Sequence, residues 1–372
     1  MKRKPRGSAR VLRNLEPVRL LLDALNIYSP TGHESKLAAF LSERMKDLGY
    51  SRVRRDSAGN VIGEIGQGKR SLILCGHMDT VPGKLIVKNS AGKIHGRGAA
   101  DAKSPLCALL LAGAESGDSG LRITFLGVTE EEGDGAGIAN FMRRMPHYDY
   151  AVFGEPGGAT KVTVGYRGRV SVNLTVKTKG GHASSPWAYM SAFAEFESAL
   201  ARLKEFESSV SRPGDHFNSV SITPTVIRAG DFHNVLPRVC ESTLDVRIPP
   251  GMRSAEVVEG MRGAIWKGLG DVAIKVSVGE ATEPYLADPG SNLVRAFQRA
   301  IITRLHSKPV FARKTGTGDM NTFASRSRVQ CVTYGPGLLR TSHSEAEAVE
   351  VEDYLDSIEV LKEAIRELGS RT

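Results

Sequence analysis

The sequence is most informative at Leu72-Ile73-Leu74-Cys75-Gly76-His77-Met78-Asp79-Thr80-Val81-Pro82-Gly83, where an apolar run leads into two polar side chains. The run predicts a buried strand that ends in a turn carrying His77 and Asp79. Residues two apart in an extended backbone point to the same side, so Asp79 can accept the free N–H of His77. That contact would fix the tautomer of His77 that binds a metal ion. A polar strand end with an ordinary turn is the alternative interpretation.

Strands and helices alternate on both sides of this segment, which predicts an α/β layered domain. Thr31 can act as the N-cap of a helix over residues 31–48, with Glu34 completing a capping box. From residue 162 the strands alternate apolar and polar residues at period two, as in an antiparallel sheet with one solvated face. The simplest division is an α/β domain over residues 14–164 and 276–372, a smaller inserted α+β domain over 165–275, and a basic flexible tail over 1–13.

The composition excludes several classes of protein. The chain has 372 residues, 41% of them hydrophobic and 24% charged, and it lacks a run of about 18 apolar residues, so we expect no membrane span. The net charge of +9 is scattered, and zinc-finger spacing is missing, so we expect no nucleic-acid partner. An acidic macromolecular substrate stays open. The four cysteines lack CxxC spacing and indicate reduced thiols in a cytoplasmic protein: Cys75, Cys107, Cys240 and Cys331.

Carboxylates recur where predicted strands end or helices begin. Asp101 lies in a glycine-rich turn before a predicted helix, where its carboxylate can bridge two cations. The triplet Glu130-Glu131-Glu132 follows a buried strand, and such carboxylates repel one another unless a cation compensates. One of them could bind metal while its neighbour takes a proton from water. Glu155 follows another strand, and His343 is a second candidate histidine far along the chain.

These candidates supply nitrogen and oxygen ligands without a thiolate, which suits hydrolytic zinc, cobalt or manganese. Two metal ions about 3.5 Å apart, sharing Asp101, would activate water and polarise an amide oxygen. The sequence has no HExxH motif, no GxSxG elbow and no phosphate-binding GxxxxGK(S/T) loop. The five candidate ligands are His77, Asp101, Glu132, Glu155 and His343.

The five segments, in this order, resemble the dinuclear-zinc family of acetylornithine deacetylase, succinyl-diaminopimelate desuccinylase and carboxypeptidase G, from about Glu16 onward. The resemblance implies a three-layer catalytic domain with a central mixed sheet, and an inserted ferredoxin-like lid and dimerisation domain. It also implies the five metal ligands with Asp101 bridging, Asp79 as the residue that orients His77, and Glu131 as the general base. Glu130 and Glu131 could be the base and ligand instead, although the family's ligand often precedes a glycine, as Glu132 does. The Asp101–Ala102 peptide is expected to be cis.

In the inserted domain, the segment Gly180–Pro186 resembles the one whose histidine, here His182, reaches the active site of a partner subunit. We therefore expect a homodimer. Asn234 and Arg247 resemble substrate-contacting positions, and Arg247 suits a bidentate grip on an α-carboxylate. A structural histidine in a glycine-rich turn and a surface arginine at a strand end are the alternatives.

Residues 98–105 and 313–321 resemble the subgroup that releases lysine or ornithine from a small, acidic amino-group carrier protein. A basic enzyme suits such a partner, and it equally suits a small acylated amino acid. Gly316 and Gly318 would let backbone N–H groups approach the substrate, and Asp319 could meet a side-chain ammonium; a plain glycine-rich turn is the alternative.

The expected reaction is therefore hydrolysis of an isopeptide-type amide, with His182 stabilising the oxyanion. An N-acyl-amino-acid deacylase such as acetylornithine deacetylase is the alternative enzyme, and a metal-free binding protein on the same scaffold is the alternative from another class. The sequence leaves open the choice between lysine and ornithine, the native metal and the role of the N-terminal tail.

Overall fold

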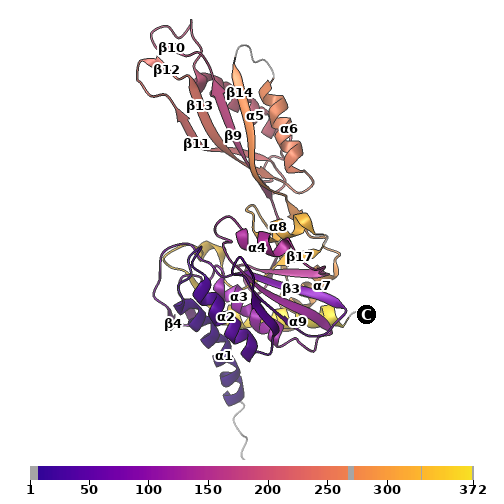
Figure 1. The fold of residues 1–372 in the computed structure, drawn as a ribbon. Helices are drawn as coiled ribbons and strands as arrows, with labels where there is room; N and C mark the ends of the chain where they lie inside the picture. Colours follow the sequence, from indigo (N-terminus) through magenta and orange to yellow (C-terminus); the bar gives the residue numbers. More distant parts are fainter. Residues whose placement is uncertain (1–6, 267–271, 328, 371–372) are drawn as a thin grey trace, which may run out of the picture. The chain divides into compact units, whose positions relative to one another are not determined.

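The computed structural model describes residues 7–266, 272–327 and 329–370, which form two compact units (Figure 1). Unit 1 holds the described residues up to Val164, together with Ala287–Ala312 and those from Thr322 on. Unit 2 holds Gly165–Leu286 and Arg313–Asn321. The boundary expected at residues 275/276 falls inside strand β14 (Ala273–Thr282), which pairs with β9 (Gly168–Lys177) and so keeps this stretch in unit 2.

Unit 1 is built on a mixed sheet. Its central strand β3 (Arg70–His77) pairs in parallel with β6 (Leu121–Val128) on one side and with β7 (Tyr150–Gly154) on the other. The carboxyl ends of these strands therefore meet at one edge of the sheet. The order is β1 (Ser51–Arg55), β2 (Val61–Ile65), β6, β3, β7, β17 (Gln330–Thr333) and β8 (Lys161–Tyr166). Strand β8 also pairs with β16 (Val310–Lys314) and with β15 (Tyr285–Leu286), whose residues are counted in unit 2.

Helix α3 (Lys103–Ala114) is the central helix of unit 1. Residues 103–113 are all buried, because α3 contacts β3, β6 and β7 as well as the helices α1 (Gly7–Asn26) and α9 (Val351–Gly369). Such a helix is apolar around most of its circumference, as this sequence is. The other helices are α2 (Ser35–Asp47), α4 (Ala136–Met142), α7 (Asn292–Leu305), α8 (Asp319–Arg326) and the 3-10 turn η1 (Leu339–Thr341), and a small sheet joins β4 (Lys88–Ser90), β5 (Lys93–His95) and β18 (Ala348–Glu350).

The N-terminal segment differs from the expected flexible tail over residues 1–13. Residues 1–6 lie outside the described part of the chain, and α1 already begins at Gly7, with Pro17 inside the helix. The alanine, leucine and arginine residues of this stretch have high helix propensity, so its basic composition does not prevent a helix.

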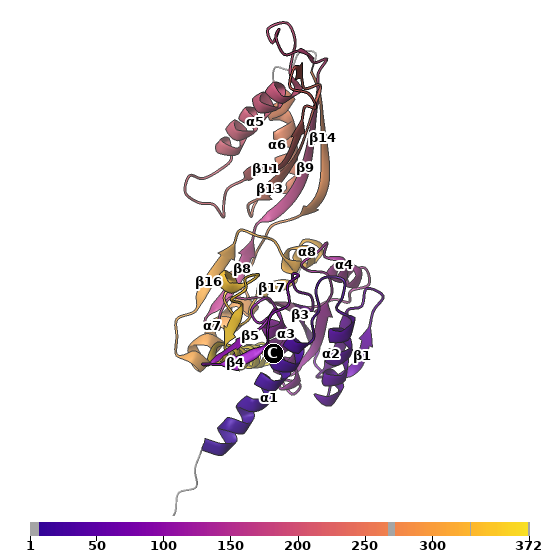
Figure 2. The same ribbon diagram turned by 90° about the vertical axis from the view of Figure 1, so that its left-hand side faces the viewer.

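Unit 2 is a four-stranded antiparallel sheet with α5 (Ala192–Ser209) and α6 (Ser254–Trp266) packed on one face (Figure 2). The strand order β11 (Ser221–Ala229), β13 (Val239–Ile248), β9, β14 is that of a ferredoxin-like fold. A two-stranded ribbon joins β10 (Gly181–His182) and β12 (Val235–Leu236). The central mixed sheet and this inserted unit confirm the predicted fold class.

The four cysteines are buried as thiols. Among the described residues, no helix combines the length and the apolar character needed to cross a membrane.

Candidate metal centre

The carboxyl ends of three neighbouring parallel strands supply most of the candidate ligands. His77 is the last residue of β3, Glu132 lies shortly after the end of β6, and Glu155 follows β7 directly. Ligand sites in α/β sheets form at this edge, because the loops that leave the strands meet there. Asp101 comes from the loop that precedes α3, and His343 comes from the loop after η1.

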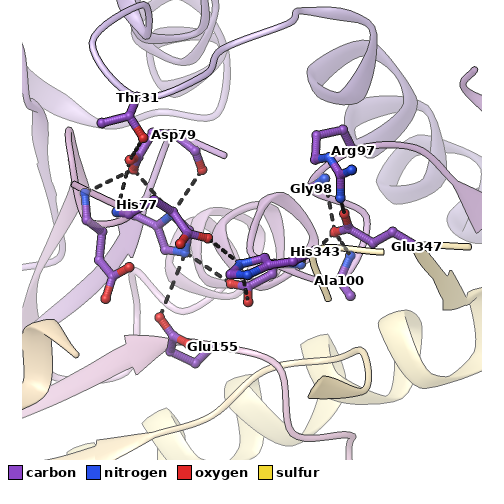
Figure 3. Close-up of polar contacts among 12 residues, drawn as sticks. Thr31, His77, Asp79, Arg97, Gly98, Ala100, Glu155, His343 and Glu347 are labelled. Atoms are coloured by element: carbon purple, nitrogen blue, oxygen red, sulfur yellow. Dashed lines mark hydrogen bonds and ion pairs between the residues drawn. The ribbon is translucent and has the colours of Figure 1, made fainter. Parts of the chain in front are cut away.

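The five predicted ligands form two groups that share Asp101. Figure 3 labels His77, Glu155 and His343 of these groups. His77 Nε2 lies 3.3 Å from Asp101 Oδ1 and 3.8 Å from Glu155 Oε1. His343 Nε2 lies 2.7 Å from Glu132 Oε1 and 3.5 Å from Asp101 Oδ2. Within each group of three, the ligand atoms lie within 4.8 Å of one another. Histidine nitrogens and carboxylate oxygens without a thiolate fit divalent zinc, cobalt or manganese.

The electrostatics of the cluster favour a cation. Burial by itself would lower the pKa of His77, yet its contacts with Asp101 and Asp79 and the charges of Glu131 and Glu155 raise it well above its usual value. Burial raises the pKa of Glu132, and the charge of Asp101 adds to this effect. Several carboxylates therefore share a small, poorly hydrated volume, and a divalent ion would offset their repulsion.

Asp79 connects His77 to the loop that carries the glutamates. Nδ1 of His77 lies 3.0 Å from the backbone oxygen of Asp79 and 3.3 Å from its Oδ1. The fully buried carboxylate also accepts hydrogen bonds from the backbone N–H groups of Glu131, at 3.1 Å, and Glu132, at 3.0 Å. Burial acts to raise its pKa, but the hydrogen bonds and charge of His77 and the hydroxyl of Thr31 lower it overall. Asp79 thus holds a ligand histidine and the glutamate loop together.

The expected capping box at the start of α2 does not form. Helix α2 begins at Ser35 and Glu34 occupies its N-cap position. The hydroxyl of Thr31 donates to Asp79 Oδ2 at 2.9 Å, and Glu34 Oε1 accepts the N–H groups of Gly32 and Glu130. Thr31 therefore contacts Asp79, and Glu34 contacts the loop that carries the glutamates, instead of forming a capping box on α2.

The members of the glutamate triplet have different surroundings. Glu132 belongs to the group with Asp101 and His343, and the charge of Glu131 acts on His77. Glu130 has a left-handed backbone, with φ of 58°, and burial together with the charge of Asp134 raises the pKa of its side chain. The peptide between Asp101 and Ala102 is cis, as expected.

Two buried charged residues beside the cluster were missed in the sequence. Arg97 and Glu347 form an ion pair, with 2.7 Å between Nη1 and Oε2. Arg97 stands in the glycine-rich turn without a distinguishing motif, and Glu347 stands in a polar segment four residues after His343. Charged residues in such segments are usually exposed, so a single sequence gave no signal for this pair.

The remaining predicted site residues lie in unit 2. His182 is exposed, its Nδ1 lies 2.8 Å from Ser184 Oγ, and the adjacent Ala183 N–H donates to the backbone oxygen of Asn234. His182 and Asn234 are therefore neighbours on the β10–β12 ribbon. Arg247 lies on β13, where its Nε donates to Asp245 Oδ1 at 2.6 Å.

The glycine-rich loop over residues 313–321 also belongs to unit 2. Gly318 donates its N–H to Asn321 Oδ1, and Asp319 begins α8. The side-chain amide of Asn321 in turn donates to the backbone oxygens of Arg167 and Glu283. These bonds anchor the loop that also contains Gly316 to the start of β9.

The mixed sheet, which is interrupted by a ferredoxin-like unit, carries two overlapping groups of nitrogen and oxygen ligands that suit divalent metal ions. Residues 73–367 match the family described as Peptidase family M20/M25/M40. The chain belongs to this family.

Three relatives are similar over nearly their whole length. A Pyrobaculum aerophilum protein, provisionally named a LysW-lysine/LysW-ornithine hydrolase, is 36% identical over 94% of this chain and 97% of its own. A LysW-lysine/LysW-ornithine hydrolase of Sulfurisphaera tokodaii is 30% identical, covering 94% of each chain. A LysW-lysine hydrolase of Deinococcus radiodurans is 31% identical over 94% of this chain and 96% of its own.

Solved structures show the same fold at lower sequence identity. The aminopeptidase PepT of Bacillus cereus matches with a TM-score of 0.82 and 20% identity, over 95% of this chain and 98% of its own. The YXEP protein of Bacillus subtilis, a dinuclear metal binding peptidase of the M20 family, matches with a TM-score of 0.75 and 14% identity, over 95% of this chain and 97% of its own.

Proposed function

We propose that this chain hydrolyses the amide bond that links lysine or ornithine to a LysW carrier protein. The observation that carries this proposal is the pair of ligand groups that share Asp101, which fits a two-metal hydrolase. The names of the similar proteins from Sulfurisphaera tokodaii and Deinococcus radiodurans support the choice of substrate. The net charge of +9 also suits an acidic carrier.

His77, Asp101 and Glu155 would hold one divalent ion, and Asp101, Glu132 and His343 the other, with zinc as the first choice and cobalt or manganese as alternatives. Such ions lower the pKa of a bound water and polarise the amide oxygen. Glu131 acts as the general base: it takes a proton from the attacking water and passes it to the leaving amine. The hydrogen bond from its backbone N–H to Asp79 supports this role, because it fixes the loop that carries the base.

The residues of unit 2 complete the proposal. His182 of the partner subunit stabilises the oxyanion in a homodimer. An exposed edge strand supports dimerisation: β11 presents Val226 and Ile227 to solvent, and a second copy would cover them. Asn234 contacts the substrate and Arg247 binds its α-carboxylate. The N–H groups of Gly316 and Gly318 approach the substrate, and Asp319 meets its side-chain ammonium. The enzyme would act in the cytoplasm, where its four thiols stay reduced.

The test compares three substrates with the metal-loaded protein: LysW-linked lysine, LysW-linked ornithine and N-acetylornithine. The release of free amino acid is followed, and the metal content of each preparation is measured. Release from the carrier conjugates alone is the expected result, and the two rates rank lysine against ornithine. Cleavage of N-acetylornithine alone would replace the substrate with a small acylated amino acid. Metal binding without hydrolysis of any of the three would favour a binding protein.

A further inference from the structure

The buried ion pair Arg97–Glu347 organises the loop that carries Asp101 (Figure 3). The side chains are 8% and 0% exposed. Oε1 of Glu347 accepts three backbone N–H groups, those of Gly98, Ala100 and Asp101, each at 3.0 Å. Its other oxygen faces the guanidinium, so both carboxylate oxygens are occupied. The backbone leading into Asp101 is therefore wrapped around one carboxylate.

Arg97 extends this arrangement to two further loops. Its Nε donates to the backbone oxygen of Gly83, at 2.9 Å, in the loop that follows His77 and Asp79. Its Nη1 also donates to the backbone oxygen of Ser344, at 3.2 Å, next to His343. A planar guanidinium with several fixed donors can hold three groups in one geometry, whereas a lysine ammonium acts as a single point. One side chain thus joins three loops that carry site residues.

The two ligand groups depend on these loops to different degrees. His77 is 2% exposed at the end of β3, and Glu155 directly follows β7, so the sheet itself places them. His343 is 48% exposed and has a left-handed backbone, with φ of 61°. A non-glycine residue keeps this conformation only where its surroundings enforce it. The position of His343 is therefore set by its loop and the bonds that anchor that loop.

We propose that Arg97 and Glu347 are positioning residues for metal binding, and that they control the group of Asp101, Glu132 and His343 more strongly than the group of His77, Asp101 and Glu155. This inference rests on the proposed two-metal function. Asp101 belongs to both groups, but the bonds of Arg97 and Glu347 fix its spacing to His343 from both sides.

The test is a cobalt(II) titration of the metal-free protein, followed by visible absorption and by metal content after dialysis. His343→Ala and Glu155→Gln give the reference spectra for loss of each site. Glu347→Gln and Arg97→Lys should bind one ion with nearly wild-type affinity and the other about 10- to 100-fold more weakly, the range for residues behind metal ligands. Their spectra should match that of His343→Ala. Asp149→Asn is the control, because Asp149 accepts the backbone N–H of Ser71 at the opposite end of β3.

A double variant, Arg97→Met with Glu347→Gln, separates positioning from general stability. It removes both buried charges yet keeps an amide oxygen for the three backbone N–H groups, so it should unfold at a higher temperature than Arg97→Met alone. It should still bind the ion held by Asp101, Glu132 and His343 weakly, since no donor then reaches the backbone oxygens of Gly83 and Ser344. Three results would each overturn the inference. The single variants could bind metal at the site of Asp101, Glu132 and His343 with unchanged affinity, or could lose affinity equally at both sites. The double variant could also bind metal at that site with full wild-type affinity. If the wild-type protein binds fewer than two ions, the proposed two-metal function itself would be wrong.

Discussion

The candidate residues of unit 1 and unit 2 differ in how the chain holds them. In unit 1, His77 and Asp79 are buried at the end of a central strand, and each has several polar partners. In unit 2, His182 is exposed on a two-residue strand, and the contact of its ring is with the neighbouring Ser184. Contacts within this chain therefore shape the cluster of unit 1, whereas His182 is exposed and would be accessible to the partner subunit proposed above.

This difference separates metal binding from turnover, which a measurement of activity alone would not distinguish. Metal binding should depend on unit 1 and be insensitive to His182. Turnover should depend on both units, because the proposed base Glu131 lies in unit 1 and the proposed oxyanion donor His182 lies in unit 2. Variants that split metal content from turnover therefore test the comparison directly.

The largest effect is expected for Glu131→Gln. Loss of a general base should lower kcat by about 10²- to 10⁴-fold, while two metal ions stay bound. Glu130→Gln is the matched control and should keep near wild-type activity, because Glu130 interacts with Asp134 outside both ligand groups. Steady-state kinetics and metal analysis on the same preparations check both outcomes. The opposite pattern, an inactive Glu130 variant and an active Glu131 variant, would shift the assignment by one residue.

His182→Ala should lower kcat by about 10²-fold or more, the range for loss of one oxyanion donor, with metal content unchanged. Mixing this variant with Glu131→Gln offers a sharper measurement. Random pairing of equal amounts of the two variants makes about half of the dimers heterodimers. If His182 acts across the dimer, each heterodimer has one intact site and one inactive site, so about a quarter of the wild-type activity should return. No recovery after verified subunit exchange would place His182 in its own subunit's site or outside catalysis.

The fold of unit 1 and the clustering of its candidate ligands were predictable, because local patterns and chain geometry point to the same result. Apolar runs that end at His77, in the glutamate triplet and at Glu155 mark parallel strands, and parallel strands bring their ends together. The ferredoxin-like order of unit 2 came from the resemblance and from period-two strands. Each of these signals is contained in a short stretch of sequence.

The residues that hold the candidate ligands in place were not predictable, because their contacts are not contained in a short stretch of sequence. Thr31 and Glu34 match a helix-capping pattern, and only the packed structure shows that they bond to Asp79 and the glutamate loop. Glu347 contacts Gly98 and Asp101 across about 250 positions of sequence, so no local pattern reports its burial. Such partners depend on tertiary contacts that one sequence does not reveal.

Asp79→Asn should have a smaller effect than the loss of Glu131 and should act on metal binding. Its neutral side chain keeps one acceptor oxygen but can no longer serve both glutamate N–H groups and His77, so metal affinity should fall about 10- to 100-fold. Isothermal titration with zinc measures the change. Thr31→Val removes one hydrogen bond to the same carboxylate and should change affinity several-fold less. Equal effects of the two substitutions would mean that Asp79 does not organise the loop.

The smallest effect is expected in unit 2, for Asp245→Asn. Asp245 pairs with Arg169 and Arg247, and although burial acts to raise its pKa, these arginines lower it overall. A carboxylate with a depressed folded-state pKa stabilises the protein above its unfolded pKa of about 3.9, and this stability is lost as the pH falls through the folded value. The variant should therefore unfold at a lower urea concentration than the wild type at pH 7 and pH 5. The free energy of unfolding should fall by only about 1 kcal/mol, because the ion pairs are partly exposed to solvent. The difference should shrink at pH 3. A difference that stays constant over this range would mean that Asp245 acts through packing rather than charge. At pH 7 the metal content of the variant should equal that of the wild type, because the five candidate ligands all lie in unit 1.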